Sequence, residues 1–245
     1  MRSLLPKLLF SAAAAVMLGL SAGEARADGI VFQGPDPCFP AGVGRGCGSE
    51  RAPHVLSLQS QGSSTSASGS VGRSGGGDVK TGDWQRGSNT QTVSLTEIGT
   101  TQASDIRIYY DLNEPNGQSR GPVTLNTLVL TAYNDAGQAV FSASLVGGPL
   151  TLTEIGNGQG HSDYVFGLDP EAAARLQAAI IANGGNIRLG LAGSVSSAEG
   201  GPESFFIGAQ PAAVPEPATM ILLGTGLAGV AAKVRKRRKA RPDQS

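Results

Sequence analysis

The chain has 245 residues with balanced charge, 19 Lys and Arg against 19 Asp and Glu, and only 5% of its residues are aromatic. The balance is not uniform, because residues 28–213 hold 9 Lys or Arg and 16 Asp or Glu, which gives 9 − 16 = −7. An acidic central region argues against binding to nucleic acid and against electrostatic docking on anionic lipid. Its length fits one domain, and its wealth of small residues favours a β-rich secreted domain over an α/β enzyme.

The first residues have the pattern of an export signal. A basic start precedes the apolar residues 8–20, and Ala25-Arg26-Ala27 matches the small-x-small rule for cleavage. The sequence therefore predicts a signal peptide over residues 1–27.

Proline and glycine dominate residues 28–53, which predicts an N-terminal loop region rather than strands. The region contains both cysteines of the chain, Cys38 and Cys47. In an oxidising compartment the two cysteines should form a disulfide that closes a small loop. The chain-entropy model gives such a bond a stabilisation of about 2–3 kcal/mol.

Residues 54–210 carry the alternation of apolar and polar residues that predicts a β-rich ectodomain. Residues 60–77 are rich in serine and glycine and predict a flexible loop or a pair of edge strands. Asn134 to Gln138, between two β-rich runs, predict a hairpin. In the run around Leu189 we expect Leu189 to point inward and Arg188 to point to solvent. The predicted strands cover residues 54–60, 93–95, 106–110, 123–133, 139–146, 151–155, 164–168, 187–191 and 203–207.

One helix is predicted, over residues 170–183. Asp169 is a suitable N-cap, Pro170 occupies the first helical position, and Gly184 is placed to end the helix. The fold class expected is thus mainly β, a β-sandwich-like ectodomain with one α-helix. Residues 94–99 and 151–156 have similar sequences, which indicates either a duplicated unit or, in our interpretation, coincidence.

Candidate sites in this domain have plain structural alternatives. His161-Ser162-Asp163 has the residue types of a hydrolase triad, but triad residues come from distant elements, so a polar turn is the better interpretation. Asp111, Asn113 and Glu114 offer oxygen ligands for calcium, although the loop departs from the EF-hand pattern and turn chemistry also explains it. Trp84 could stack on a sugar ring or cover an edge of the core. No constellation predicts an enzyme or requires a cofactor.

The end of the chain is the most informative segment. Residues 211–217 form a proline-rich linker that ends in Val214, Pro215, Glu216 and Pro217. The 15 uncharged residues 218–232 predict a short transmembrane helix, which rises about 22 Å against a hydrocarbon core of about 30 Å. Residues 233–245 form a basic tail that the positive-inside rule places in the cytoplasm. The basic residues that give this topology signal are Lys233, Arg235, Lys236, Arg237, Arg238 and Lys239.

This layout resembles the PEP-CTERM sorting signal of exported proteins in Gram-negative bacteria. The resemblance implies recognition by an exosortase-type membrane protease or transpeptidase, and export across the inner membrane with the ectodomain outside the cytoplasm. The sorting tail, the low complexity and the absence of a catalytic constellation together favour a non-enzymatic cell-surface or extracellular-matrix protein linked to exopolysaccharide or biofilm production. A carbohydrate- or calcium-binding surface module is the alternative function, and an ordinary membrane anchor without processing is the alternative reading of the tail.

Overall fold

Strands make up most of the regular structure in the computed structural model, which describes residues 29–36, 52–113, 121–155 and 162–210. The strands are β1 (Gly29–Pro35), β2 (His54–Leu58), β3 (Ala67–Ser74), β4 (Gly77–Gly82), β5 (Val93–Ser94), β6 (Ile106–Asp111), β7 (Val123–Tyr133), β8 (Ala139–Leu145), β9 (Leu150–Leu152), β10 (Tyr164–Leu168), β11 (Arg188–Ser196) and β12 (Glu203–Ala209). The helical elements are α1 (Leu95–Ile98), the 3₁₀ turn η2 (Ala103–Asp105) and α2 (Pro170–Ala182).

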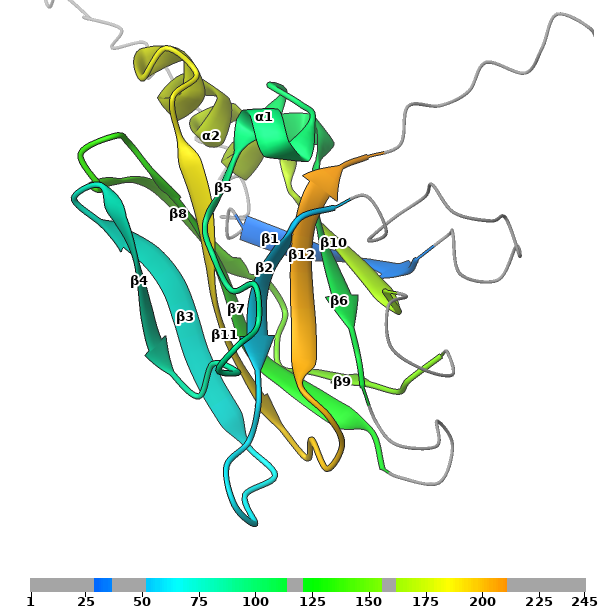
Figure 1. Cartoon of the computed structure of the whole chain (residues 1–245). Coiled ribbons are helices and arrows are strands. Elements are labelled where there is room, and N and C mark those ends of the chain that lie inside the picture. Colours follow the sequence, from blue (N-terminus) through cyan, green and yellow to red (C-terminus); the bar gives the residue numbers. More distant parts are fainter. Residues whose placement is uncertain (1–28, 37–51, 114–120, 156–161, 211–245) are drawn as a thin grey trace, which may run out of the picture.

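All twelve strands belong to one curled sheet (Figure 1). Its path runs β2-β12-β6-β10-β1-β8-β7-β11-β3-β4, with β5 added beside β11 and β9 beside β7. The chain that leaves β4 returns to β2, because Leu58 forms a bridge with Trp84 and the Gln85 N–H donates to the Ser57 carbonyl at 2.9 Å. The mainly β prediction is confirmed, but the two ends of the path meet in one continuous sheet rather than in two separate sheets.

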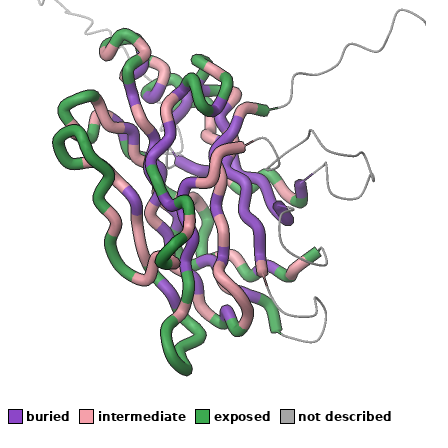
Figure 2. The backbone as a smooth tube through the Cα atoms, in the orientation of Figure 1, coloured by how far each residue is buried: buried purple, intermediate pink, exposed green. Residues whose placement is uncertain are grey.

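The core lies inside the curl, where the buried positions of facing strands meet (Figure 2). Tyr110 of β6 and Phe205 of β12 are register partners, and their rings stack with centroids 4.4 Å apart. Along β7 the buried residues change phase between Leu125 and Leu128, at a bulge opposite β11. A bulge adds one residue to one strand, so both halves of β7 still turn their apolar side chains inward.

Helix α2 begins where it was predicted and ends one residue earlier, at Ala182. The Asp169 side chain accepts the Ala172 N–H at 2.8 Å, and Pro170 follows as the first helical residue. Beyond the helix, Gly184 and Gly185 have positive φ and let the chain reverse. The buried stripe of α2 packs over η2, β8, β1 and β10, so the helix closes one end of the curl.

The prediction of loop structure throughout residues 28–53 is wrong for β1. This strand pairs antiparallel with β10 and parallel with β8, and Ile30 is fully buried between them. Only Gly29 to Pro35 form the strand, and the flanking glycine and proline masked it in the sequence. Cys38 and Cys47 lie outside the described residues.

The prediction of a strand through Leu95 is also corrected. Ser94 ends β5 and caps α1: its Oγ accepts the Glu97 N–H, and the Glu97 carboxylate accepts the Ser94 N–H at 2.7 Å. This Ser-x-x-Glu pattern is a capping box, which the sequence already contained. Residues 151–155 instead contain part of strand β9, so the two similar segments form different structures and coincidence explains them better than duplication. Of the two alternatives for residues 60–77, the structure has the strand pair, because β3 and β4 form a hairpin. Only β4 lies at the end of the sheet, since β3 also pairs with β11.

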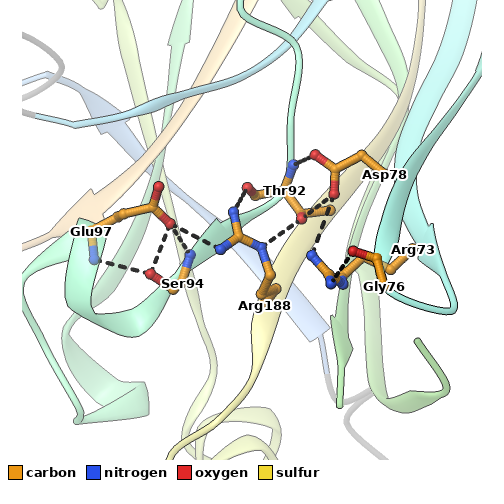
Figure 3. A network of polar contacts seen from close by, with 7 residues as sticks. All are labelled: Arg73, Gly76, Asp78, Thr92, Ser94, Glu97 and Arg188. Carbon is orange, nitrogen blue, oxygen red and sulfur yellow. Dashed lines mark hydrogen bonds and ion pairs between the residues drawn. The ribbon is translucent and has the colours of Figure 1, made fainter. Parts of the chain in front are cut away.

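The sequence indicated that Arg188 points to solvent, but in the structure its side chain is bound by neighbouring residues. Its guanidinium donates to Thr92 Oγ1 at 2.9 Å and to the Thr92 carbonyl, and its Nη1 lies 3.3 Å from a Glu97 oxygen (Figure 3). Thr92 in turn bonds through its N–H and its Oγ1 to the Asp78 carboxylate, and Asp78 pairs with Arg73. The network joins the β3–β4 hairpin to β5, α1 and β11. Leu189 is fully buried, as predicted.

Candidate functional site

A polar pocket of about 440 Å³ opens on the outer face of β12, between β2 and β6. Its hydroxyl and imidazole groups come from His54, Ser57, Ser88 and Ser204. Its carboxamide groups come from Gln85, Asn89 and Asn113. Asp111, Pro202 and Phe206 are the other described residues of the lining, which thus combines many neutral polar groups with one carboxylate and two apolar side chains.

Strand register brings the centre of the pocket together. Ser204 of β12 pairs with Ser57 of β2 on one side and with Asp111 of β6 on the other. Side chains directly opposite each other on paired strands share one face of the sheet. These three polar residues therefore lie in a row across three strands.

A bulge in β2 adds His54 to the same face. Phe206 of β12 pairs with His54 and Phe205 pairs with Leu56, which leaves Val55 as the extra residue. In a regular strand, residues 54 and 57 would point to opposite faces, because side chains alternate. The bulge removes that conflict and lets both line the pocket.

Hydrogen bonds connect the side chains of His54, Ser57 and Ser204 in series. His54 Nε2 lies 2.8 Å from Ser57 Oγ, and Ser57 Oγ lies 3.0 Å from Ser204 Oγ. The His54 ring also meets the Phe206 ring edge-on, with centroids 5.1 Å apart. Burial lowers the pKa of His54 below its ordinary value of 6.5, so its imidazole is neutral at pH 7 and has one nitrogen that can donate and one that can accept.

The loop that carries Gln85 and Asn89 is tied to β2 at both ends. The Gln85 N–H donates to the Ser57 carbonyl at 2.9 Å, and the Gln91 N–H donates to the Val55 carbonyl at 3.0 Å. Inside the loop, Ser88 Oγ donates to the Gln85 carbonyl at 2.8 Å. These bonds hold the backbone of the loop over the pocket, while the side-chain amides of Gln85 and Asn89 take part in no hydrogen bond within the described part of the chain.

The predicted calcium ligands are only partly brought together. Asp111 is buried and Asn113 is half-buried, and both line the pocket, whereas Glu114 lies outside the described residues. Within residues 29–36, 52–113, 121–155 and 162–210, no group of three His, Cys, Asp or Glu side chains is arranged to hold a metal ion. Calcium at Asp111 stays a prediction.

The residues that resembled a hydrolase triad serve the fold. Ser162 Oγ donates to the Asp36 carboxylate, and both side chains are buried. Asp163 accepts the backbone N–H groups of Leu112 and Ile155, each at 2.9 Å. His161 lies outside the described residues, and the partners of Ser162 and Asp163 fit the interpretation of a polar turn.

Trp84 covers an edge of the core, as the structural interpretation of this residue predicted. It is half-buried and packs against the core, and Lys80 Nζ lies 4.8 Å from the centre of its ring. The sequence analysis missed the pocket residues other than Asp111 and Asn113. They come from three separate segments, which only the register of β2, β6 and β12 brings to Asp111 and Asn113.

The sorting residues Val214 to Pro217, residues 218–232 and the basic residues from Lys233 to Lys239 lie outside the described residues. None of the helices in the part of the chain that the structure describes is long and apolar enough to cross a membrane. A family model of the PEP-CTERM protein-sorting motif matches residues 213–238. The chain is a PEP-CTERM sorting-domain protein.

The match confirms the resemblance on the residues that carried it. It includes the Pro-Glu-Pro, the apolar segment and the basic residues up to Arg238. A PEP-CTERM motif marks an exported, membrane-associated protein of Gram-negative bacteria that an exosortase-type membrane enzyme sorts and processes. No curated protein and no solved structure matches this PEP-CTERM protein, so the comparisons assign no activity to its β-rich domain.

Proposed function

We propose that this PEP-CTERM protein is a non-enzymatic component of the cell surface or extracellular matrix, delivered by its sorting motif and linked to exopolysaccharide or biofilm production. The motif at residues 213–238 is the observation that carries the proposal. The curled β domain is then the exported cargo, and its acidic composition is compatible with a place outside the cytoplasm.

The polar side chains in the described domain support a role other than catalysis. Ser57 is the serine with the partner that a nucleophile needs, since His54 Nε2 is 2.8 Å away. However, this residue is only 2% exposed, and its Oγ also bonds to Ser204. A nucleophile must reach its substrate, so a buried hydroxyl between two protein partners suits a structural role better.

Cell fractionation tests this proposal. We expect the tagged protein to reach the cell surface or matrix in a strain that has its exosortase genes, and to remain unprocessed in the inner membrane in a strain that lacks them. We also expect matrix formation to change when the gene for this chain is deleted. Identical location and size in both strains would contradict the sorting part, and an unchanged matrix would contradict the link to exopolysaccharide.

The second candidate function is a carbohydrate- or calcium-binding surface module. The pocket on β12 favours carbohydrate over calcium, because the described residues of its lining have one carboxylate and a majority of neutral hydroxyl and amide groups. Calcium sites need several oxygen ligands close together, usually with more than one carboxylate.

A further inference from the structure

We infer that the pocket between β2, β6 and β12 binds one neutral sugar unit, a hexose or N-acetylhexosamine, through the amides of Gln85 and Asn89 and the hydroxyl of Ser204. This inference rests on the second candidate function and names its ligand class and its site. The volume of about 440 Å³ lies in the range of small-molecule sites, about 300–1,000 Å³.

Charge narrows the class of ligand. Among the residues that the structure describes, no Lys or Arg belongs to the lining, which has one carboxylate, that of Asp111. His54 adds no positive charge at neutral pH, because burial lowers its pKa. A phosphate, sulfate or carboxylate ligand would find no cation among these described residues, so they favour a neutral ligand.

The hydrogen-bonding capacity of the lining narrows the class of ligand further. A carboxamide carries two donors and an acceptor, and a serine hydroxyl both donates and accepts. The hydroxyls of a sugar have the same dual character, so each can donate to one group and accept from another. Gln85 and Asn89 keep this capacity available, because no hydrogen bond among the described residues occupies their side-chain amides. Phe206 and Pro202 supply apolar wall for the C–H groups of a sugar.

The frame of the pocket is formed before any ligand arrives. Ser57 and Ser204 sit on paired strands at a fixed separation of 3.0 Å between their Oγ atoms. The loop above them is held to β2 by backbone bonds at Gln85 and Gln91. A site with fixed backbone loses less entropy on binding, which strengthens even a few neutral hydrogen bonds.

Saturation-transfer difference NMR on the purified full-length protein tests this assignment. The probes are free glucose, galactose, mannose and N-acetylglucosamine, with glucuronic acid and glucose 6-phosphate as charged comparisons. The test variant is the double substitution Gln85→Leu and Asn89→Leu. The control is Gln91→Leu, which changes an exposed amide of the same loop that does not line the pocket.

We expect at least one neutral sugar to receive saturation, with affinity falling about tenfold or more in the double variant and staying unchanged in the control. Thermal unfolding of all three proteins verifies that each is folded. If the double variant still binds neutral sugars, the assignment of the site to this pocket is wrong, although the protein still binds carbohydrate. Absence of any neutral-sugar signal in the wild type would overturn both, as would equal or tighter binding of the charged sugars. Sorting is measured separately, by the size and location of the protein, so failure of sugar binding can be told apart from failure of the sorting proposal.

Discussion

The carboxylate of Asp163 accepts the backbone N–H of Leu112 at 2.9 Å, across 51 residues of the chain. Its other oxygen accepts the Ile155 N–H, also at 2.9 Å. The side chain is only 1% exposed, so water cannot replace it as an acceptor for Leu112. One buried carboxylate thus fixes the chain just beyond β6 to the chain just beyond β9, beside the strand that supplies Asp111 to the pocket.

Asp163→Asn should destabilise the domain by about 2–3 kcal/mol, because an amide can accept with only one of its two terminal atoms and its NH₂ would face a backbone N–H. Chemical denaturation of the purified protein measures this loss. Asp135→Asn, in the exposed turn between β7 and β8, is the matched control and should unfold like the wild type. Equal stability of both variants would show that Asp163 does not hold these segments.

Leu189→Asp and Arg188→Asp should both destabilise the domain, in contrast to the sequence-based expectation that only the first matters. Leu189→Asp places a charge in the core and should prevent stable folding. Arg188→Asp leaves the Thr92 carbonyl without its donor and puts a carboxylate beside Glu97, so its melting temperature should fall clearly.

Arg188→Lys is the control for that second variant, because it keeps the positive charge near Glu97 but cannot reproduce the planar fork of donors. We expect a loss of stability between those of the wild type and Arg188→Asp. A melting temperature for Arg188→Asp that equals the wild-type value would contradict the network drawn in Figure 3.

Local patterns predicted the elements whose signals lie close together in sequence. Asp169, Pro170 and Gly184 fixed both ends of α2, and the turn at residues 134–138 fixed the β7–β8 hairpin. In contrast, the curl of the sheet depends on long-range pairing, such as the bridge between Leu58 and Trp84, that no local pattern encodes.

The pocket was hidden from the sequence for a related reason. Strict alternation places His54 and Ser57 on opposite faces of a strand, and only the bulge at Val55 brings them to one face. The prediction for Arg188 was wrong for a similar reason. An alternating pattern indicates that its side chain points away from the core, but it does not show that Thr92 and Glu97 lie there and bind the guanidinium.

Stability should fall as the pH drops below 6.5, and His54 should cause part of that fall. Burial lowers the pKa of His54 in the folded protein, so the unfolded chain takes up the proton at higher pH than the folded one. The contribution of His54 to stability is therefore complete above pH 6.5 and is lost as the pH falls through the lowered folded pKa. Melting temperatures of the wild type and His54→Gln, from about pH 7.5 to about pH 5, measure it. His54→Gln should show a shallower decline, and parallel curves would contradict the prediction.

The most direct test of the sorting function replaces Pro215, Glu216 and Pro217 with alanine in the full-length protein. The change leaves the apolar residues 218–232 and the basic tail intact, so membrane insertion should be preserved. A second variant that neutralises the basic residues from Lys233 to Lys239 serves as the contrast. It should pass through the membrane, because 15 apolar residues anchor weakly without charged flanks.

The measurement is the size and the membrane fraction of each protein in cells that carry an exosortase. The sorting account predicts that the triple-alanine protein accumulates unprocessed in the inner membrane. A triple-alanine protein with the size and location of the wild type would contradict it and reduce the tail to an ordinary anchor.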